Sequence, residues 1–215
     1  MPTTLSERDS KALLAPYGIP LAAERLVTSP DAAAVAATEL GYPVAVKLCG
    51  DNIAHKTERG LVRLGLSDPD AVAAASAALL DAARPEDRAT GVLVAPMVSG
   101  NRELIAGIAT DPQFGRTVLV GIGGILTEAI ADASIRRIPI TLLDAEEMID
   151  DLATQSLLGP FRGEPPVDRQ VLARALVGLS DAAEAHPEIV SADLNPLIVS
   201  EGRPVAVDAL VEVTS

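Results

Sequence analysis

The chain has 215 residues, a formal net charge of −13 and a hydrophobic content of 48%, which is enough for one large domain or two lobes with a real core. Aromatic residues make up only 2% of the chain, and there is no tryptophan. This excludes aromatic platforms for single-stranded nucleic acid, and the acidic balance excludes broad binding to a phosphate backbone. Any phosphate site is therefore expected to be local, built from a few cations, backbone N–H groups and a metal ion.

The sequence also bears on where the protein works. Its only cysteine is Cys49, so no internal disulfide is possible, which fits a reducing compartment. We expect Cys49 to serve in packing rather than as a nucleophile. The N-terminus lacks the basic and apolar regions of a signal peptide, and no apolar run reaches the ~18 residues of a membrane span. We therefore expect a cytoplasmic protein.

The first half of the chain is predicted to mix helices and strands. Ser6 is a candidate cap for a first helix, with Asp9 three residues later, and that helix is expected to stop around residues 17–20. Proline at the first helical position and glycine after the last mark a helix at 31–40. The other predicted elements are strands at 24–27, 43–48, 60–66 and 91–94 and a helix at 70–83.

The second half is predicted to be richer in strands. Pro96 cannot donate to a strand ladder, so it fits a strand end or a hinge between two lobes. Glu201-Gly202 is the expected turn of a hairpin that closes the chain, whereas 111–115 is expected to be a structural turn. The predicted elements are strands at 102–109, 116–122, about 125–131, 134–140, 189–199 and 204–213 and helices around 144–152 and 168–184.

The segment 47–60, KLCGDNIAHKTERG, has the strongest chemical character. Lys47 ends an apolar run, and an isolated buried ammonium is costly, so a ligand phosphate is one good partner; the alternative is a lysine at the rim. His55 lies in a polar loop, and a neutral imidazole can act as a nucleophile at cytoplasmic pH. Its neighbour Lys56 would favour the neutral ring and stabilise a phosphoryl group carried on it. The alternative is a solvated loop histidine.

Two further patterns carry possible ligand groups. The glycine-rich run 121–128, GIGGILTE, follows an apolar strand and can present backbone N–H groups to an anion; a bulged turn is the alternative. Asn195 and Asp208 lie on the two strands of the predicted hairpin and offer oxygens to Mg²⁺, which takes few protein ligands. Their alternative is a polar pair at a hairpin end, because Asn-Pro is a turn signal. Together these parts indicate a nucleotide clamped between two lobes, and phosphoryl transfer.

Several motifs of one protein family occur in this chain in the same order, which makes the resemblance to that family specific. The sequence resembles the ATP-grasp domain (beta subunit) of NDP-forming acyl-CoA synthetases of the ADP-forming acetyl-CoA synthetase type over roughly residues 5–213. The stretches that carry it are PVAVKLCGDNIAHKTERGLVRLGL, GVLVAPMVSGNRELIAGIATDPQFG, VLVGIGGILTEAIADASIRRIPI and ADLNPLIVSEGRPVAVDA.

The resemblance implies an α/β (α+β) ATP-grasp fold, with two lobes of largely antiparallel sheet flanked by helices and a nucleotide site between them. It implies a single domain at 1–215, with lobe 1 at about 1–94, a hinge at 95–98 and lobe 2 at about 99–215. It also implies ATP/ADP and Mg²⁺ as cofactors, and site residues in four groups. These are the catalytic His55; the phosphate-side Lys47, Gly123 and Gly124; the adenine-side hinge Ala95, Pro96, Met97 and Val98, with Glu103 near the ribose or triphosphate; and the metal ligands Asn195 and Asp208.

The resemblance also implies an acid–thiol ligase subunit that passes a phosphoryl group between His55 and Mg-ADP. The chain shows no CoA-binding dinucleotide-type fold, so a CoA-binding alpha subunit is the expected partner; the start at Met1 favours a separate subunit. The alternatives are another ATP-grasp ligase that works through a free acyl phosphate, and a non-catalytic adenine-nucleotide sensor. In the family a valine and a second glycine usually stand where Arg59 and Leu61 stand here, and Leu61 weighs against free movement of the His55 loop. Ala95 replaces a usual Gln or Glu.

Overall fold

The computed structural model describes residues 2–53, 56–124 and 131–214. The chain divides into two compact units. The N-terminal unit consists of Ala22–Met97 with Thr4–Asp9, and the C-terminal unit consists mainly of Val98–Ser215 with Ser10–Leu21.

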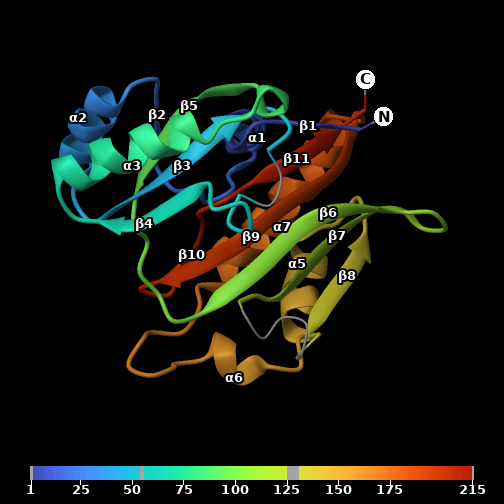
Figure 1. Cartoon of the computed structure of the whole chain (residues 1–215). Helices are drawn as coiled ribbons and strands as arrows, with labels where there is room; N and C mark the ends of the chain where they lie inside the picture. Colours follow the sequence, from blue (N-terminus) through green and yellow to red (C-terminus); the bar gives the residue numbers. More distant parts are fainter. Residues whose placement is uncertain (1, 54–55, 125–130, 215) are drawn as a thin grey trace. The chain divides into compact units, whose positions relative to one another are not determined.

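A four-stranded antiparallel sheet forms the N-terminal unit, in the order β2-β5-β3-β4. Helices α2 and α3 pack against each other and against this sheet (Figure 1). The elements are β2 (Arg25–Val27), α2 (Pro30–Leu40), β3 (Val44–Gly50), β4 (Val62–Leu66), α3 (Pro69–Asp81), the 3-10 helix η2 (Pro85–Asp87) and β5 (Ala89–Pro96).

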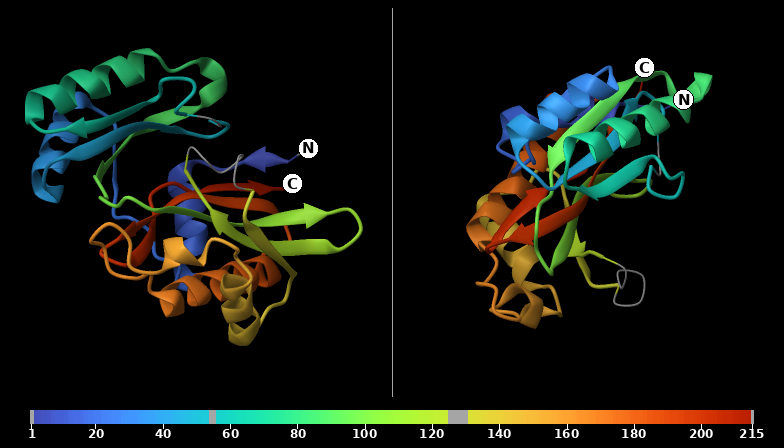
Figure 2. Two further views of the ribbon diagram at one scale, coloured as in Figure 1. Left: turned by 90° about the horizontal axis from the view of Figure 1, so that it is seen from below. Right: turned by 60° about the vertical axis from the view of Figure 1, so that its left-hand side comes forward.

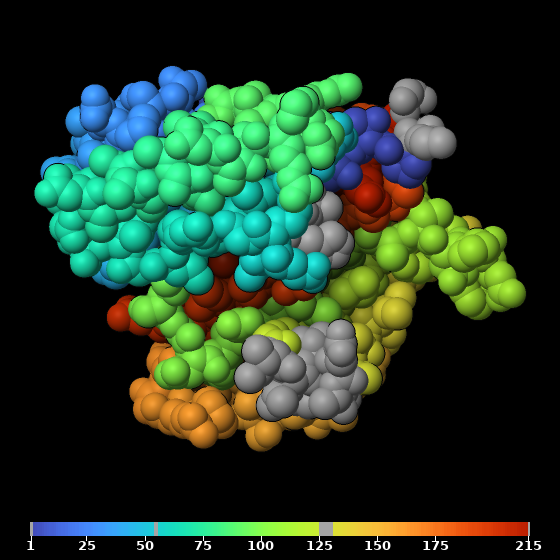
Figure 3. Space-filling model, viewed as in Figure 1, coloured from blue at the N-terminus to red at the C-terminus, as the bar shows by residue number. Residues whose placement is uncertain are grey.

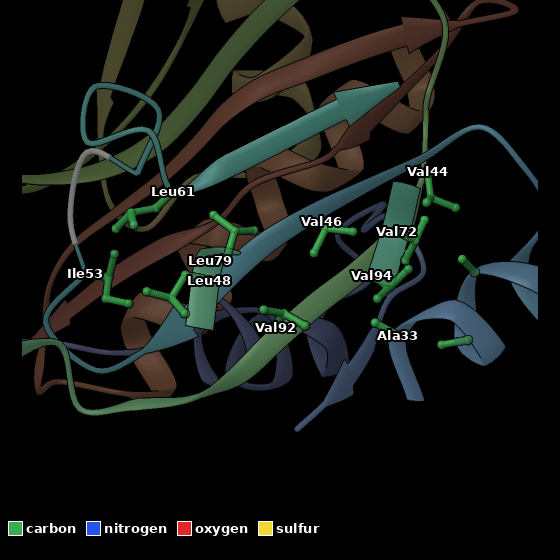
Figure 4. Packing of buried hydrophobic residues seen from close by; sticks show 12 residues of the cluster. Ala33, Val44, Val46, Leu48, Ile53, Leu61, Val72, Leu79, Val92 and Val94 are labelled. Atoms are coloured by element: carbon green, nitrogen blue, oxygen red, sulfur yellow. The ribbon is translucent and has the colours of Figure 1, made fainter. Parts of the chain in front are cut away.

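Local sequence explains these elements well. Ser29 and Asp68 accept hydrogen bonds from Ala32 N–H (3.2 Å) and Ala71 N–H (2.8 Å), so both predicted helices begin at side-chain caps. All seven residues of β3 are buried, as expected for the central strand of a covered sheet. The core between sheet and helices is aliphatic (Figure 4), and it includes Val46, Leu48, Val72, Leu79, Val92 and Val94.

The C-terminal unit is built on a larger sheet, in which the described strands follow the order β1-β11-β9-β6-β7-β8, with β10 also paired to β9. Helices α5 and α7 pack together on one face of this sheet (Figure 2). The elements are β1 (Thr3–Thr4), η1 (Ala15–Tyr17), β6 (Glu103–Asp111), β7 (Gly115–Ile122), β8 (Ala133–Arg137), α5 (Leu142–Asp150), α6 (Gln155–Leu158), α7 (Arg169–Ala185), β9 (Ile189–Ser200), β10 (Arg203–Ala206) and β11 (Leu210–Val213).

Helix α1 (Glu7–Leu14) belongs to both units along the chain, because residues 7–9 fall in the first and residues 10–14 in the second. Its start is the predicted one. Ser6 Oγ accepts from Asp9 N–H at 3.1 Å and donates to the Asp9 carboxylate at 2.6 Å. Further along, Ser10 Oγ accepts from Val211 N–H at 3.0 Å in a buried contact, which fixes the second turn of α1 to strand β11.

The predicted strand at 204–213 is wrong in one respect. It is interrupted at residues 207–209, because β10 pairs with the second half of β9 and β11 pairs with the first half. The hairpin turn itself is confirmed: Glu201 and Gly202 both have positive φ, 47° and 85°, as a two-residue hairpin loop requires. Asn195-Pro196 lies within β9 and is not a turn.

Other boundaries differ modestly from the predictions. Strand β8 ends at Arg137, three residues early, and the short helix α6 was not predicted. The strand expected at about 125–131 falls almost entirely outside the described residues. The 111–115 turn is confirmed as a structural turn: Asp111 Oδ1 accepts from the N–H groups of Gln113 and Phe114 at 2.7 and 2.8 Å. This turn between β6 and β7 projects from its unit (Figure 3), and Phe114 is 63% exposed there.

Candidate functional site

Lys47 lies in the middle of β3 and is buried, with 8% of its surface exposed. Its Nζ donates to Glu7 Oε1 at 2.7 Å, and the Glu7 side chain is only 1% exposed. The rim-lysine alternative is therefore wrong. The buried ammonium has a protein partner, Glu7, where the sequence suggested a ligand phosphate. A carboxylate brought from α1, 40 residues earlier in the chain, leaves no local signal beside Lys47.

Lys56 contacts the same carboxylate. Its Nζ donates to Glu7 Oε2, and the residue is 7% exposed. His55, the predicted phosphoryl acceptor, lies outside the described residues. Lys56 next to it in the sequence is fixed by two bonds, since its backbone carbonyl also accepts from Leu61 N–H at 2.8 Å.

Apolar residues anchor the loop on both sides of this point. Ile53 and Leu61 are 3% and 2% exposed and belong to the core of the N-terminal unit. Figure 4 shows them beside Leu48 and Leu79. Leu61 stands where the family has its second glycine, and it acts here as a core residue rather than as a hinge.

Arg59 supplies a further anchor, also at a position where this chain departs from the family. Its two terminal nitrogens donate to the two Asp87 oxygens at 2.8 and 2.9 Å, the bidentate geometry typical of strong Arg–carboxylate pairs. Asp87 is buried, and the Arg59 hydrogen bonds hold the pKa of its carboxyl below the usual value. The loop is therefore tied to η2.

The segment predicted to lie beside the adenine, 95–98, begins at the end of β5. Ala95 and Pro96 are the last residues of the strand, paired with Ala45 and Val44. Met97 N–H then donates to Pro43 O at 2.9 Å. Pro96 thus occupies the predicted strand end, and Val98 is the first residue of the C-terminal unit.

The structure brings Glu103 together with the two predicted glycines. Gly123 N–H donates to Glu103 O at 2.8 Å. Gly124 has φ of +85°, and a Cβ there would lie 3.4 Å from Glu103 Oε2. The positive φ would strain any other residue at this position, whereas a Cβ would make only an ordinary contact with the Glu103 carboxylate, so the backbone conformation accounts for the glycine.

The predicted metal ligands also lie together, in the C-terminal unit. Asp208 occupies the break between β10 and β11, and Val207 N–H beside it donates to Pro196 O at 3.2 Å, next to Asn195. A third residue joins them. Although solvent reaches Asp193, desolvation by neighbouring protein, and then the Asp208 charge, raise the pKa of its carboxyl, while a hydrogen bond from Asn195 lowers it.

Asp193 was not among the predicted metal ligands. Its spacing was an available signal, because residues two apart on a strand share a face. Two carboxylates and an amide fit a hard divalent cation, since a cation would relieve their mutual repulsion. Within the described ranges, no three or more His, Cys, Asp or Glu side chains form a metal-binding group, so water or phosphate oxygens would have to complete the coordination.

One further residue, Cys49, agrees with the expectation from the sequence. Cys49 is a free, buried thiol whose pKa is raised by that burial, which suits packing rather than nucleophilic chemistry. No helix in the described part of the chain is both long and apolar enough to cross a membrane.

The fold and these motifs define a family. A family model described as an ATP-grasp domain matches residues 2–213, and the chain belongs to the ATP-grasp family. It is 36% identical over 216 residues to the beta subunit of acetate–CoA ligase [ADP-forming] II from Pyrococcus furiosus, across 97% of this chain and 91% of that subunit. The predicted fold and the family resemblance are confirmed.

Two solved structures have the same fold as this chain. One of the dinucleotide-forming acetyl-coenzyme A synthetase 1 from Ca. Korarchaeum cryptofilum, in complex with coenzyme A, Ca-AMPCP and HgCl⁺, has a TM-score of 0.91 and 33% identity, and the match covers 99% of this chain and 94% of that one. Another structure of that synthetase has a TM-score of 0.82 and 32% identity over 97% and 92% of the two chains. It holds coenzyme A and Mg-AMPPCP, with its phosphohistidine segment pointing towards the nucleotide binding site.

Proposed function

We propose that this chain is the nucleotide-binding subunit of an ADP-forming acyl-CoA synthetase, an acid–thiol ligase of the acetate–CoA ligase type. It transfers a phosphoryl group between His55 and ADP. The observation that carries the proposal is the HKTE motif at 55–58 in an ATP-grasp chain that is 36% identical to the beta subunit of such a ligase. The similar synthetase structure, whose phosphohistidine segment points towards the nucleotide binding site, supports it.

The transfer is a simple displacement in each direction. When ATP is formed, a β-phosphate oxygen of ADP attacks the phosphorus on His55, and the N–P bond breaks with its electron pair returning to the imidazole. In reverse, the lone pair of the neutral imidazole forms the N–P bond while the bond from phosphorus to the β–γ bridging oxygen breaks and ADP leaves. Such a reaction needs positioning and charge more than covalent assistance.

The residues of each unit have distinct proposed parts in this reaction. In the N-terminal unit, Lys47 neutralises nucleotide phosphates and the backbone of 95–98 meets the adenine. In the C-terminal unit, Gly123 and Gly124 face the phosphates beside Glu103. The proposed single domain uses 95–98 as the hinge between its two lobes.

A divalent metal completes the proposed site. Asn195 and Asp208, joined by Asp193, would hold Mg²⁺, which when bound screens the phosphate charges. The crowding of the Asp193 and Asp208 carboxylates supports this assignment. The cofactors are then ATP/ADP and Mg²⁺, as in the Mg-AMPPCP complex of the relative.

Acyl and CoA chemistry requires a second component. The similar Pyrococcus furiosus protein is a beta subunit, and the similar synthetase binds coenzyme A. We propose a CoA-binding alpha subunit or domain as the partner, and the cytoplasm, where Cys49 would stay reduced, as the location.

The test is labelling with Mg²⁺ and γ-labelled ATP, alone and with a CoA-binding partner subunit. We expect an acid-labile, base-stable label on His55 that ADP removes. The chain has two histidines, so His186→Ala is the matched control: it keeps the label, whereas His55→Ala loses it. Bound ATP without label in both mixtures would favour nucleotide sensing, and ligase activity retained by His55→Ala would favour a free acyl phosphate.

A further inference from the structure

One buried carboxylate holds two lysines in the N-terminal unit. Glu7 Oε1 accepts from Lys47 Nζ at 2.7 Å, and Glu7 Oε2 accepts from Lys56 Nζ. The three side chains are 1%, 10% and 7% exposed, respectively. A carboxylate this deeply buried is stable only when it is paired, so the three charges depend on one another.

The segment that carries Glu7 contacts the loop on both sides of residues 54–55. Before them, Asn52 N–H donates to Thr4 O at 3.3 Å; after them, Lys56 reaches Glu7. Glu7 is the first residue of α1, whose start is fixed by the Ser6 cap, and an acid is favoured at that end of a helix. The helix start therefore presents the carboxylate to the loop in a defined place.

The use of lysine in this chain is selective. Only three of its 17 basic residues are lysines, and all three are buried. Two of them, Lys47 and Lys56, contact Glu7, and the third, Lys11, donates to Val207 O at 3.1 Å. Lysines are normally placed on the surface, so the pairing on Glu7 is a specific arrangement and not a general feature of the chain's surface.

We propose that Glu7 is a positioning residue for phosphoryl transfer, in that its one carboxylate ties Lys56, the sequence neighbour of the phosphoryl acceptor, to Lys47, the nucleotide-phosphate lysine. This rests on the proposed function. Glu7 acts through the two lysines: it fixes the loop next to His55 relative to the strand that meets the nucleotide phosphates. A displacement of about 1 Å at such a site costs on the order of 100-fold in rate.

The first test measures the rate of His55 phosphorylation from Mg-ATP, with nucleotide affinity measured separately, in Glu7→Gln, Lys56→Gln and the double variant. We expect each single variant to slow labelling about 10- to 100-fold. The double variant should be no slower than the slower single variant, because both substitutions break the same Glu7–Lys56 contact. Glu164→Gln is the stability control, since it removes the carboxylate partner of the buried Arg102; it keeps the wild-type rate. If Glu7→Gln does not fold, Glu7→Asp, one methylene shorter, is measured in its place.

The second test does not depend on activity. Reductive methylation followed by peptide mass spectrometry reports on each of the three lysines, and Lys56 should react several-fold faster in Glu7→Gln than in the wild type, with Lys11 unchanged. The role of Glu7 is overturned if wild type and Glu7→Gln are labelled at equal rates. It is also overturned if the effects of the two single variants multiply in the double variant. Either result leaves the proposed function standing. A wild-type chain that gains no label on His55, either alone or with the partner subunit, overturns the proposed function. Unchanged Lys56 reactivity in Glu7→Gln overturns the Glu7 contact by itself.

Discussion

Leu61→Gly restores the residue that the family usually has after HKTE and should strongly destabilise this protein. Leu61 is 2% exposed, belongs to the core cluster and donates its N–H to Lys56 O. Truncating a buried leucine to alanine costs about 2–5 kcal/mol, and the larger backbone entropy that glycine loses on folding adds about 0.5–1 kcal/mol. The expected total is about 2.5–6 kcal/mol in the free energy of unfolding of the N-terminal unit.

Urea denaturation followed by circular dichroism measures this loss, and hydrogen exchange over residues 51–62 locates it. The matched control is Leu64→Gly on the neighbouring strand β4, where the side chain is 63% exposed; it should cost about 1 kcal/mol. Equal losses in the two variants, or unchanged exchange in the loop, would show that Leu61 does not anchor the His55 segment.

Three other contacts should have measurable effects on stability or metal binding. The ion pair with Arg59 lowers the folded-state pKa of Asp87. The stability that this pair contributes is therefore present above the unfolded pKa of ~3.9 and is lost as the pH falls through the folded pKa. The difference in unfolding free energy between wild type and Asp87→Asn should shrink between pH 7 and pH 3, and a constant difference would contradict this. Asp208→Asn should abolish the extra thermal stabilisation that Mg²⁺ gives with ADP over ADP alone, and a wild-type response to Mg²⁺ would remove Asp208 from the metal site. A Cβ on Gly107 would lie 2.4 Å from a β9 carbonyl oxygen, whereas a Cβ on Gly159 would have its nearest atom 3.7 Å away. Urea denaturation should therefore show that Gly107→Ala lowers the free energy of unfolding by more than ~1 kcal/mol and Gly159→Ala by much less. Equal losses in the two variants would refute the clash.

Local chemistry accounts for what could be read from the chain. The cap at Ser6, proline at the start of α2, and Glu201-Gly202 in the hairpin each depend on neighbours within a few residues, and each was predicted where it is found. Strand β9 shows where local signals fail. Its Asn195-Pro196 dipeptide is a turn signal, yet the residues before and after it pair with neighbouring strands and it lies within β9.

The candidate site divides in the same way. The sequence alone determined the family, the order of the motifs and the choice of Lys47, His55, Asn195 and Asp208 as candidate site residues, because residue type and spacing carry that information. Only the tertiary structure decided that Lys47 and Lys56 share the carboxylate of Glu7. The physical reason is that a buried charge must find its partner across the fold, and pairings over 40 residues or more are set by packing rather than by local sequence.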